Sequence, residues 1–135
     1  MKIWTLIFTF NYPGNVGSYV AISSRFVIAR GKNSLVLYNC VNKTISWEVL
    51  NFQPWVLRFD FGENLLVTST DGLHKYSLDD RGKLTQIWKC GDATGEGGIA
   101  FTMYRDIVVP SFIDKEICII SSQGLPVSYS QFLSH

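Results

Sequence analysis

The residues of this chain that could carry out chemistry are few and widely spaced. The two histidines are His74, inside an apolar strand-like segment, and His135, the last residue. The members of a Ser-His-Asp set come from distant parts of a fold, so sequence spacing cannot identify one. With one interior histidine and no motif around it, we expect no catalytic set.

The three cysteines are Cys40, Cys90 and Cys118, separated by long intervals. Their odd number and their spacing fit neither a disulfide framework nor a compact zinc site. Each lies in or beside an apolar run, which predicts buried, reduced thiols and favours a cytoplasmic location. We therefore predict no structural disulfide and no bound metal.

The segment 91–98 is rich in glycine, as phosphate-binding loops are. It contains no Lys-Ser or Lys-Thr pair, and no helical pattern follows it. A phosphate loop needs both features, because the helix N-terminus helps to hold the anion. We expect this segment to be a flexible connection between strands, and we predict no cofactor.

Arginine and tyrosine residues in the predicted turns are candidates for a contact surface. Both residue types are enriched where proteins bind one another. Arg25, Arg81, Tyr104 and Arg105 each fall between two predicted strands. We predict that they contact a protein partner; the alternative is that each is an ordinary solvated loop residue.

The composition is that of a folded, strand-rich domain with little net charge. Of the 135 residues 47% are hydrophobic, 14% are aromatic and 17% are charged, and the net charge is +1. Such a balance gives no electrostatic attraction to nucleic acid. Lys2 and the apolar segment 3–10 resemble the start of a secretory signal but are short, and no run approaches the roughly 18 apolar residues of a membrane span. We predict a soluble cytoplasmic protein that binds neither nucleic acid nor a membrane.

Tryptophans mark an internal repeat. Trp4, Trp47 and Trp88 follow one another at nearly equal intervals, and one more interval of the same length leads to Tyr129. The segment 33–47 also matches 115–129, without a gap, when it is shifted by two such intervals. A period of roughly 40 residues is typical of propeller blades. We predict that Trp47 and Trp88 are equivalent core positions.

Each repeat contains four short segments with the two-residue alternation of β-strands. The predicted strands are 19–22, then 26–29, 35–39, 44–50 and 55–61, then 64–70, 73–78, 84–90 and 98–103, then 106–112, 116–121 and 126–132. Asp71-Gly72 predicts a tight hairpin. The result is one all-β domain, 1–135, of about three four-stranded antiparallel blades of the β-propeller type, over 19–61, 62–103 and 104–135. The strand at 19–22 is expected to supply the missing outer strand of the last blade, by exchange between two chains.

The repeat resembles the blades of WD-repeat proteins. The resemblance rests on the segment 57–76, which is similar to the stretch of those proteins that runs from the outermost strand of one blade into the first two strands of the next. The Gly-His and Trp-Asp dipeptides of that family are absent. Tyr38, Tyr76 and Ile120 stand where its tryptophan would be.

A second resemblance is to the quinoprotein-type propellers. The segment 37–47 looks like one of their blades, with Asn39 in place of Asp and Lys43 in place of Gly. These two departures argue against quinone binding. Both resemblances imply a β-propeller fold, and a fold does not by itself specify a function.

Three blades are too few to close a propeller, which has four to eight. Open ends would leave unpaired strand edges, and such edges pair readily with another chain. We predict a homodimer that completes a six-bladed ring, or completion by a different protein partner; the alternatives are an open stack or a piece of a larger protein. The predicted function is a non-catalytic protein-interaction or scaffold module. The alternative is a subunit of a hydrolytic or quinone-dependent enzyme with its site on the propeller face.

Overall fold

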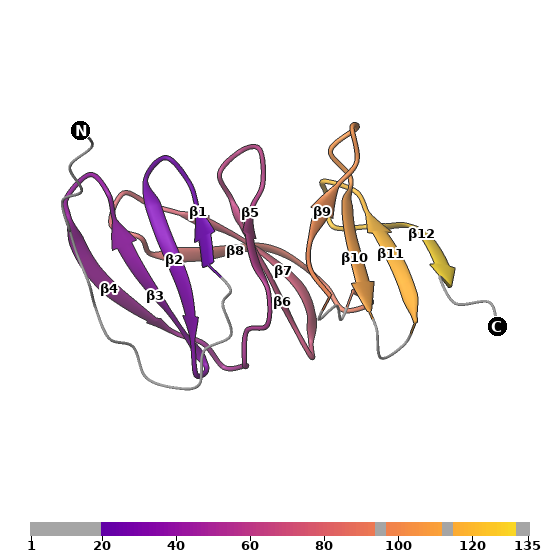
Figure 1. The fold of residues 1–135 in the computed structure, drawn as a ribbon, viewed down its shortest axis with the longest axis horizontal. Coiled ribbons are helices and arrows are strands. Elements are labelled where there is room, and N and C mark those ends of the chain that lie inside the picture. Colours follow the sequence, from indigo (N-terminus) through magenta and orange to yellow (C-terminus); the bar gives the residue numbers. More distant parts are fainter. Residues whose placement is uncertain (1–19, 94–96, 112–114, 132–135) are drawn as a thin grey trace, which may run out of the picture.

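A computed structural model describes residues 20–93, 97–111 and 115–131, and in these ranges the regular structure is all β-strand. The strands form three four-stranded antiparallel sheets that lie side by side (Figure 1). The first sheet contains β1 (Val20–Ile22), β2 (Phe26–Gly31), β3 (Ser34–Asn39) and β4 (Thr44–Val49). The middle sheet contains β5 (Leu57–Phe59), β6 (Leu65–Ser69), β7 (Gly72–Leu78) and β8 (Leu84–Cys90). The third contains β9 (Ala100–Phe101), β10 (Ile107–Ser111), β11 (Glu116–Ile120) and β12 (Pro126–Gln131).

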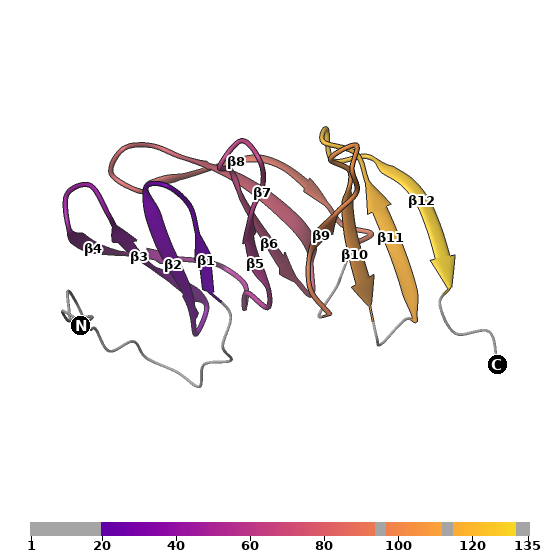
Figure 2. The same cartoon turned by 45° about the horizontal axis from the view of Figure 1, so that its top comes forward.

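Within each sheet the strands pair in chain order (Figure 2). Short turns join the strands of one sheet, and the longer segments 50–56 and 91–99 carry the chain to the next sheet. The first strands β1, β5 and β9 therefore form one edge of their sheets, and β4, β8 and β12 form the opposite edge. No helix long and apolar enough for a membrane span occurs in the part of the chain that the structure describes.

Two apolar layers hold the three sheets together. The first layer joins the first and middle sheets and includes Ile28, Leu37 and Val67. The second layer joins the middle and third sheets and includes Leu66 and Ile120. Neighbouring residues of β6 point into opposite layers, since side chains alternate along a strand, and the whole strand is buried. This explains why Leu65, Leu66 and Val67 of β6 are apolar without alternation, whereas β4 and β8 at the outer edge carry exposed residues.

The predicted division of the strands into blades is shifted by one strand relative to the observed sheets. The strand at 20–22 pairs with β2 in the first sheet, with Val20 opposite Ala29, so it does not complete the third sheet. Leu57, predicted to lie in the last strand of the first blade, is instead opposite Val67 in the middle sheet. Likewise β9 pairs with β10 in the third sheet. The prediction that the strand at 19–22 is exchanged into the last blade is therefore wrong: each sheet contains four strands of its own, because the short turns decide which strands pair.

Trp47 and Trp88 occupy equivalent places in different surroundings. Both lie on the fourth strand of a sheet. Trp47 is 46% exposed, so the prediction that it is a core residue is wrong. Trp88 packs against the second apolar layer and donates its Nε1–H to the carbonyl oxygen of Ser122 at 3.1 Å. Trp4, with the rest of the segment 1–10, lies outside the described residues.

The turn before the fourth strand reaches back over the preceding sheet in two of the three sheets. A Cβ on Gly82 would lie 3.2 Å from the Phe26 side chain, and a Cβ on Gly124 would lie 2.5 Å from the ring of Trp88. Both glycines have positive φ, at +86° and +84°, which side-chain-bearing residues adopt at a cost. In the first sheet the corresponding position of the turn is Lys43, with φ 59°. The close approach therefore accounts for glycine in the second and third sheets only.

Candidate functional site

Six turns share one end of the stack of sheets, which we call the loop face. Because the strands are antiparallel, the turn after the first strand and the turn after the third strand of every sheet emerge at the same end (Figures 1 and 2). These turns lie at 23–25, 40–43, 60–64, 79–83, 102–106 and 121–125. The loop face contains all of the predicted contact residues.

Side-chain oxygens shape the turns of the loop face, and the turns at 60–64 and 102–106 are examples. Asp60 Oδ1 accepts hydrogen bonds from the backbone N–H groups of Gly62 and Asn64, each at 2.9 Å. In the third sheet Thr102 Oγ1 accepts from the N–H of Tyr104 at 3.2 Å. Asp and Thr stabilise turns in this way because their short side chains reach backbone donors two residues away. The middle residues of both turns are thereby held at the surface.

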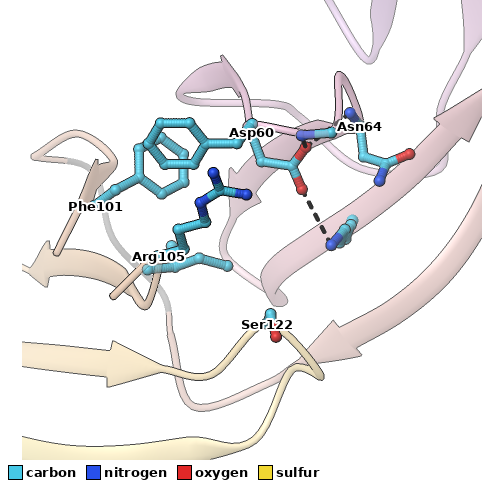
Figure 3. Close-up of a pocket in the computed structure, with 9 residues that line it drawn as sticks. Asp60, Asn64, Phe101, Arg105 and Ser122 are labelled. Carbon is cyan, nitrogen blue, oxygen red and sulfur yellow. Dashed lines mark hydrogen bonds and ion pairs between the residues drawn. The ribbon is translucent and has the colours of Figure 1, made fainter. Parts of the chain in front are cut away.

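A pocket of about 190 Å³ opens between the middle and third sheets at the loop face (Figure 3). Part of its wall is an ion pair in which Lys75 Nζ lies 3.1 Å from Asp60 Oδ2, and the two side chains are only 13% and 12% exposed. Each of these charges is compensated by the other. The remaining wall contains apolar, polar and cationic residues: Phe61, Gly62, Asn64, Phe101, Arg105, Ile107 and Ser122.

Two arginines and two phenylalanines stack beside this pocket, and we call them the arginine–phenylalanine stack. The rings of Phe61 and Phe101 are 5.2 Å apart at their centroids and tilted by 59°. The Arg105 guanidinium lies 4.9 Å from the Phe61 ring, and that of Arg58 lies 4.9 Å from the Phe101 ring. Cation–π contact of this kind orients a guanidinium and leaves its N–H edge for other partners. Phe61 remains 61% exposed.

A second depression, of about 440 Å³, lies on the loop face between the first and middle sheets. Arg25 is bound there: its Nη1 is 3.3 Å from Asp80 Oδ1, and its Nη2 donates to the carbonyl oxygen of Leu78 at 3.1 Å. The Nδ2 of Asn39 donates to the Asp80 carbonyl oxygen at 2.9 Å. Arg81 lines the same depression. These bonds join the two sheets and occupy the guanidinium of Arg25.

A carboxylate also connects the turns of the first and middle sheets. Glu63 accepts hydrogen bonds from the hydroxyl of Ser24, at 2.8 Å, and from the backbone N–H of the same residue. These two bonds favour the ionised form and lower the pKa of Glu63 below its usual value. The carboxylate of the middle sheet is therefore engaged by the first sheet.

The four predicted contact residues share the loop face but occupy two separate places on it. Arg105 lines the pocket between the middle and third sheets, and Tyr104, which precedes it in the same turn, is 80% exposed. Arg25 and Arg81 lie at the depression between the first and middle sheets. The structure therefore does not bring the four residues together into one continuous patch.

The aromatic and buried charged residues of the pocket were not predicted from the sequence. Phe101 and Lys75 lie within strands, where sequence alone does not reveal which face is covered. Phe61 carried a usable signal, because it is a large apolar residue in the turn between Asp60 and Asn64. An apolar residue at such a position is exposed unless something else covers it.

His74 lies in the first apolar layer, toward the end opposite the loop face. Its Nε2 is 3.2 Å from Ser69 Oγ and its Nδ1 is 3.2 Å from Gln86 Oε1, which fits a neutral ring protonated on Nδ1. The ring stacks on Phe52 with 4.3 Å between centroids. Burial lowers the pKa of His74 and raises that of the neighbouring Tyr76 to about 12. Since Ser69 is 0% and His74 4% exposed, a substrate cannot reach this pair as it stands.

No group of three His, Cys, Asp or Glu side chains among the described residues is arranged to hold a metal ion.

No family model matches the sequence, and no curated protein matches it. Solved structures do match. A streptogramin B lyase aligns with 86% of this chain at a TM-score of 0.64 and 13% identity. A virginiamycin B lyase from Staphylococcus aureus aligns with 91% at 0.65 and 14% identity.

A protein of unknown function from Bacteroides caccae aligns with 85% of the chain, at a TM-score of 0.55 and 12% identity. The chain spans 40%, 41% and 45% of these three structures, less than half of each. At such low identity the likeness shows the fold alone. Together with the three four-stranded sheets, it shows that the chain is all-β and of the β-propeller type, as the sequence predicted.

Proposed function

We propose that this protein is a non-catalytic protein-interaction module that binds partners through its loop face. The observation that carries the proposal is a group of large, exposed side chains around Arg105: Phe61, Met103 and Tyr104 are 61%, 86% and 80% exposed. Aromatic residues, methionine and arginine are the residue types enriched in protein interfaces. Their positions are held by the turn hydrogen bonds of Asp60 and Thr102, which reduces the entropy that binding would cost.

A partner-capture experiment tests this proposal. The tagged protein and its Phe61→Ser and Tyr104→Ser variants are used to capture partners that are then identified and titrated. We expect either substitution to weaken binding of an identified partner by about tenfold or more, as truncation of an aromatic anchor commonly does. Ile87→Ser is the matched control, because Ile87 is also an exposed apolar residue, at 49%, but lies on β8 at the outer edge. Equal binding by all four proteins would refute the proposal.

We also propose that the chain assembles with a second copy through its end sheets. Val20 and Ile22 on β1 are 47% and 70% exposed. Residues at the same two positions of the middle sheet, Leu57 and Phe59, pack into the first apolar layer. The exposed face of the first sheet is thus suited to packing against another sheet. Two copies would supply six blades, within the range of four to eight at which propellers close.

The particular class of propeller is also a proposal. We infer a WD-repeat-like blade from the equivalence of Tyr38, Tyr76 and Ile120, which lie on the third strands β3, β7 and β11. Each is opposite a second-strand residue at the same level of its sheet: Val27, Leu65 and Ile107. The lyase names belong to the structural neighbours and are not transferred to this chain, because a fold hosts many activities.

A further inference from the structure

The cations of the loop face differ in whether a carboxylate compensates them. Lys75 is paired with Asp60, and Arg25 is paired with Asp80. Arg105 makes no side-chain hydrogen bond or ion pair with any described residue. Its guanidinium instead lies over the uncharged ring of Phe61. The loop face therefore has an uncompensated guanidinium beside an open pocket.

Arg58 at the other end of the arginine–phenylalanine stack also lacks a carboxylate partner among the described residues. Its Nη1 donates to the carbonyl oxygen of Ile99 at 2.7 Å, which fixes the side chain but leaves its positive charge. Both carboxylates on the turn that contains Phe61 are already engaged: Asp60 is paired with Lys75, and Glu63 accepts a hydrogen bond from Ser24. The stack thus presents two positive charges on either side of two aromatic rings.

We propose that the arginine–phenylalanine stack binds an acidic segment of a partner protein, in which a carboxylate pairs with Arg105 and a neighbouring apolar side chain enters the pocket. This inference rests on the proposed function and names the chemistry of the partner. A guanidinium held flat against a ring presents a planar N–H edge that matches a carboxylate with two parallel hydrogen bonds. The pocket of about 190 Å³ has room for one apolar side chain.

A nucleic acid could in principle use the same arginines and rings, but the surroundings favour a peptide. The net charge of the chain is only +1. Both loop-face turns of the middle sheet contain carboxylates: the turn at 60–64 contains Asp60 and Glu63, and the turn at 79–83 contains Asp79 and Asp80. The loop face therefore has many carboxylates. A phosphate backbone needs several cations without nearby anions. One or two carboxylates beside an apolar residue need only the two arginines of the stack.

Fluorescence anisotropy with synthetic probes tests the inference. The first probe is a labelled peptide of alternating glutamate and leucine, the second replaces every glutamate by glutamine, and the third is a labelled single-stranded oligonucleotide. We expect the glutamate peptide to bind about tenfold more tightly than the glutamine peptide, because hydrogen bonds to charged groups are stronger than neutral ones. Added salt should reduce the difference, since the pair is exposed to solvent.

Arg105→Gln should weaken binding of the glutamate peptide by about tenfold and leave the glutamine peptide unchanged. Arg81→Gln is the matched control: it removes the same charge from the same loop face, but at the depression between the first and middle sheets. Phe61→Leu, which keeps an apolar residue but removes the ring that orients Arg105, should also weaken binding. Circular dichroism and thermal melting of each variant verify that the fold is retained.

Several outcomes would overturn the inference. These are equal binding of the two peptides, equal losses in Arg105→Gln and Arg81→Gln, no binding of either peptide, or tighter binding of the oligonucleotide. The proposed function is judged separately, by the Phe61→Ser and Tyr104→Ser captures. If those substitutions reduce capture of an identified partner while the acidic peptide fails to bind, the loop face is an interface for a partner of different chemistry.

Discussion

At the scale of single residues, the buried ring of His74 makes stability depend on pH. The folded state lowers the pKa of His74, chiefly by burial, below the value of about 6.5 of an exposed histidine. Below that pH the unfolded chain binds the proton more readily than the folded chain, so the free energy of unfolding falls as the pH falls. We expect urea denaturation to show a loss of stability between about pH 7 and pH 5 that is smaller in His74→Gln. The same loss in both proteins would contradict this assignment.

Trp88 and Trp47 should differ in their contribution to stability. Trp88 packs into the second apolar layer, donates to the Ser122 carbonyl oxygen and lies 5.8 Å from the Lys75 ammonium, whereas Trp47 is nearly half exposed. We expect Trp88→Ala to lower the free energy of unfolding by about 3 kcal/mol and Trp47→Ala by about 1 kcal/mol. Chemical denaturation of both variants measures this. Equal losses would mean that the two tryptophans contribute alike because they occupy the same position of the repeat, whatever their surroundings.

The exposure of individual loop residues was predictable from the sequence, but their grouping was not. Arg105 and Tyr104 are in a turn and are exposed there, as the sequence indicated. Their neighbours Phe61 and Phe101 come from different sheets, and the stack exists only because the two sheets pack at a particular spacing. That spacing is set by the side chains of the second apolar layer, which no local pattern encodes.

At the scale of the elements, the turn at 121–125 is constrained by its approach to the middle sheet. Gly124→Ala would force a left-handed residue at a cost of about 1–2 kcal/mol and would also press a methyl group against the Trp88 ring. We expect a total loss of about 3 kcal/mol in the native background. In a Trp88→Leu background the same substitution should cost only the backbone part, because the ring is gone. An identical cost in both backgrounds, measured by a double-mutant cycle, would mean that the turn does not press on the ring.

The positions of the strands could be predicted, and their division into sheets could not. The alternation of apolar residues located the twelve strands to within a few residues, and the predicted hairpin is present, with Thr70 and Asp71 as its loop and Gly72 paired with Ser69. The period of a sequence repeat, however, does not show where one blade ends and the next begins. The boundary is set by chain geometry: short turns pair strands, and the longer connections 50–56 and 91–99 cross between sheets.

At the scale of the whole molecule, the exposed face of the first sheet predicts self-association. We expect light scattering after gel filtration to give twice the 15.3 kDa mass of one chain. Ile22→Lys should shift the protein to a monomer, because a charge would be buried between two sheets. Ile87→Lys is the control, since Ile87 is exposed on a strand at the outer edge. A monomer at all concentrations, or dissociation by both substitutions alike, would contradict assembly through this face.

The two buried cysteines lie in the same apolar layer, and this gives the molecule a built-in reporter. Cys90 and Cys118 both belong to the layer between the middle and third sheets, and the layer between the first and middle sheets contains no cysteine among the described residues. Thiol reagents reach a buried cysteine only when the structure around it opens. After the half-buried Cys40 has reacted, the rate of labelling at Cys90 and Cys118 will therefore time the separation of the third sheet from the middle one. Opening of the first sheet alone will leave both thiols unlabelled, so one reagent can distinguish which end of the stack detaches first.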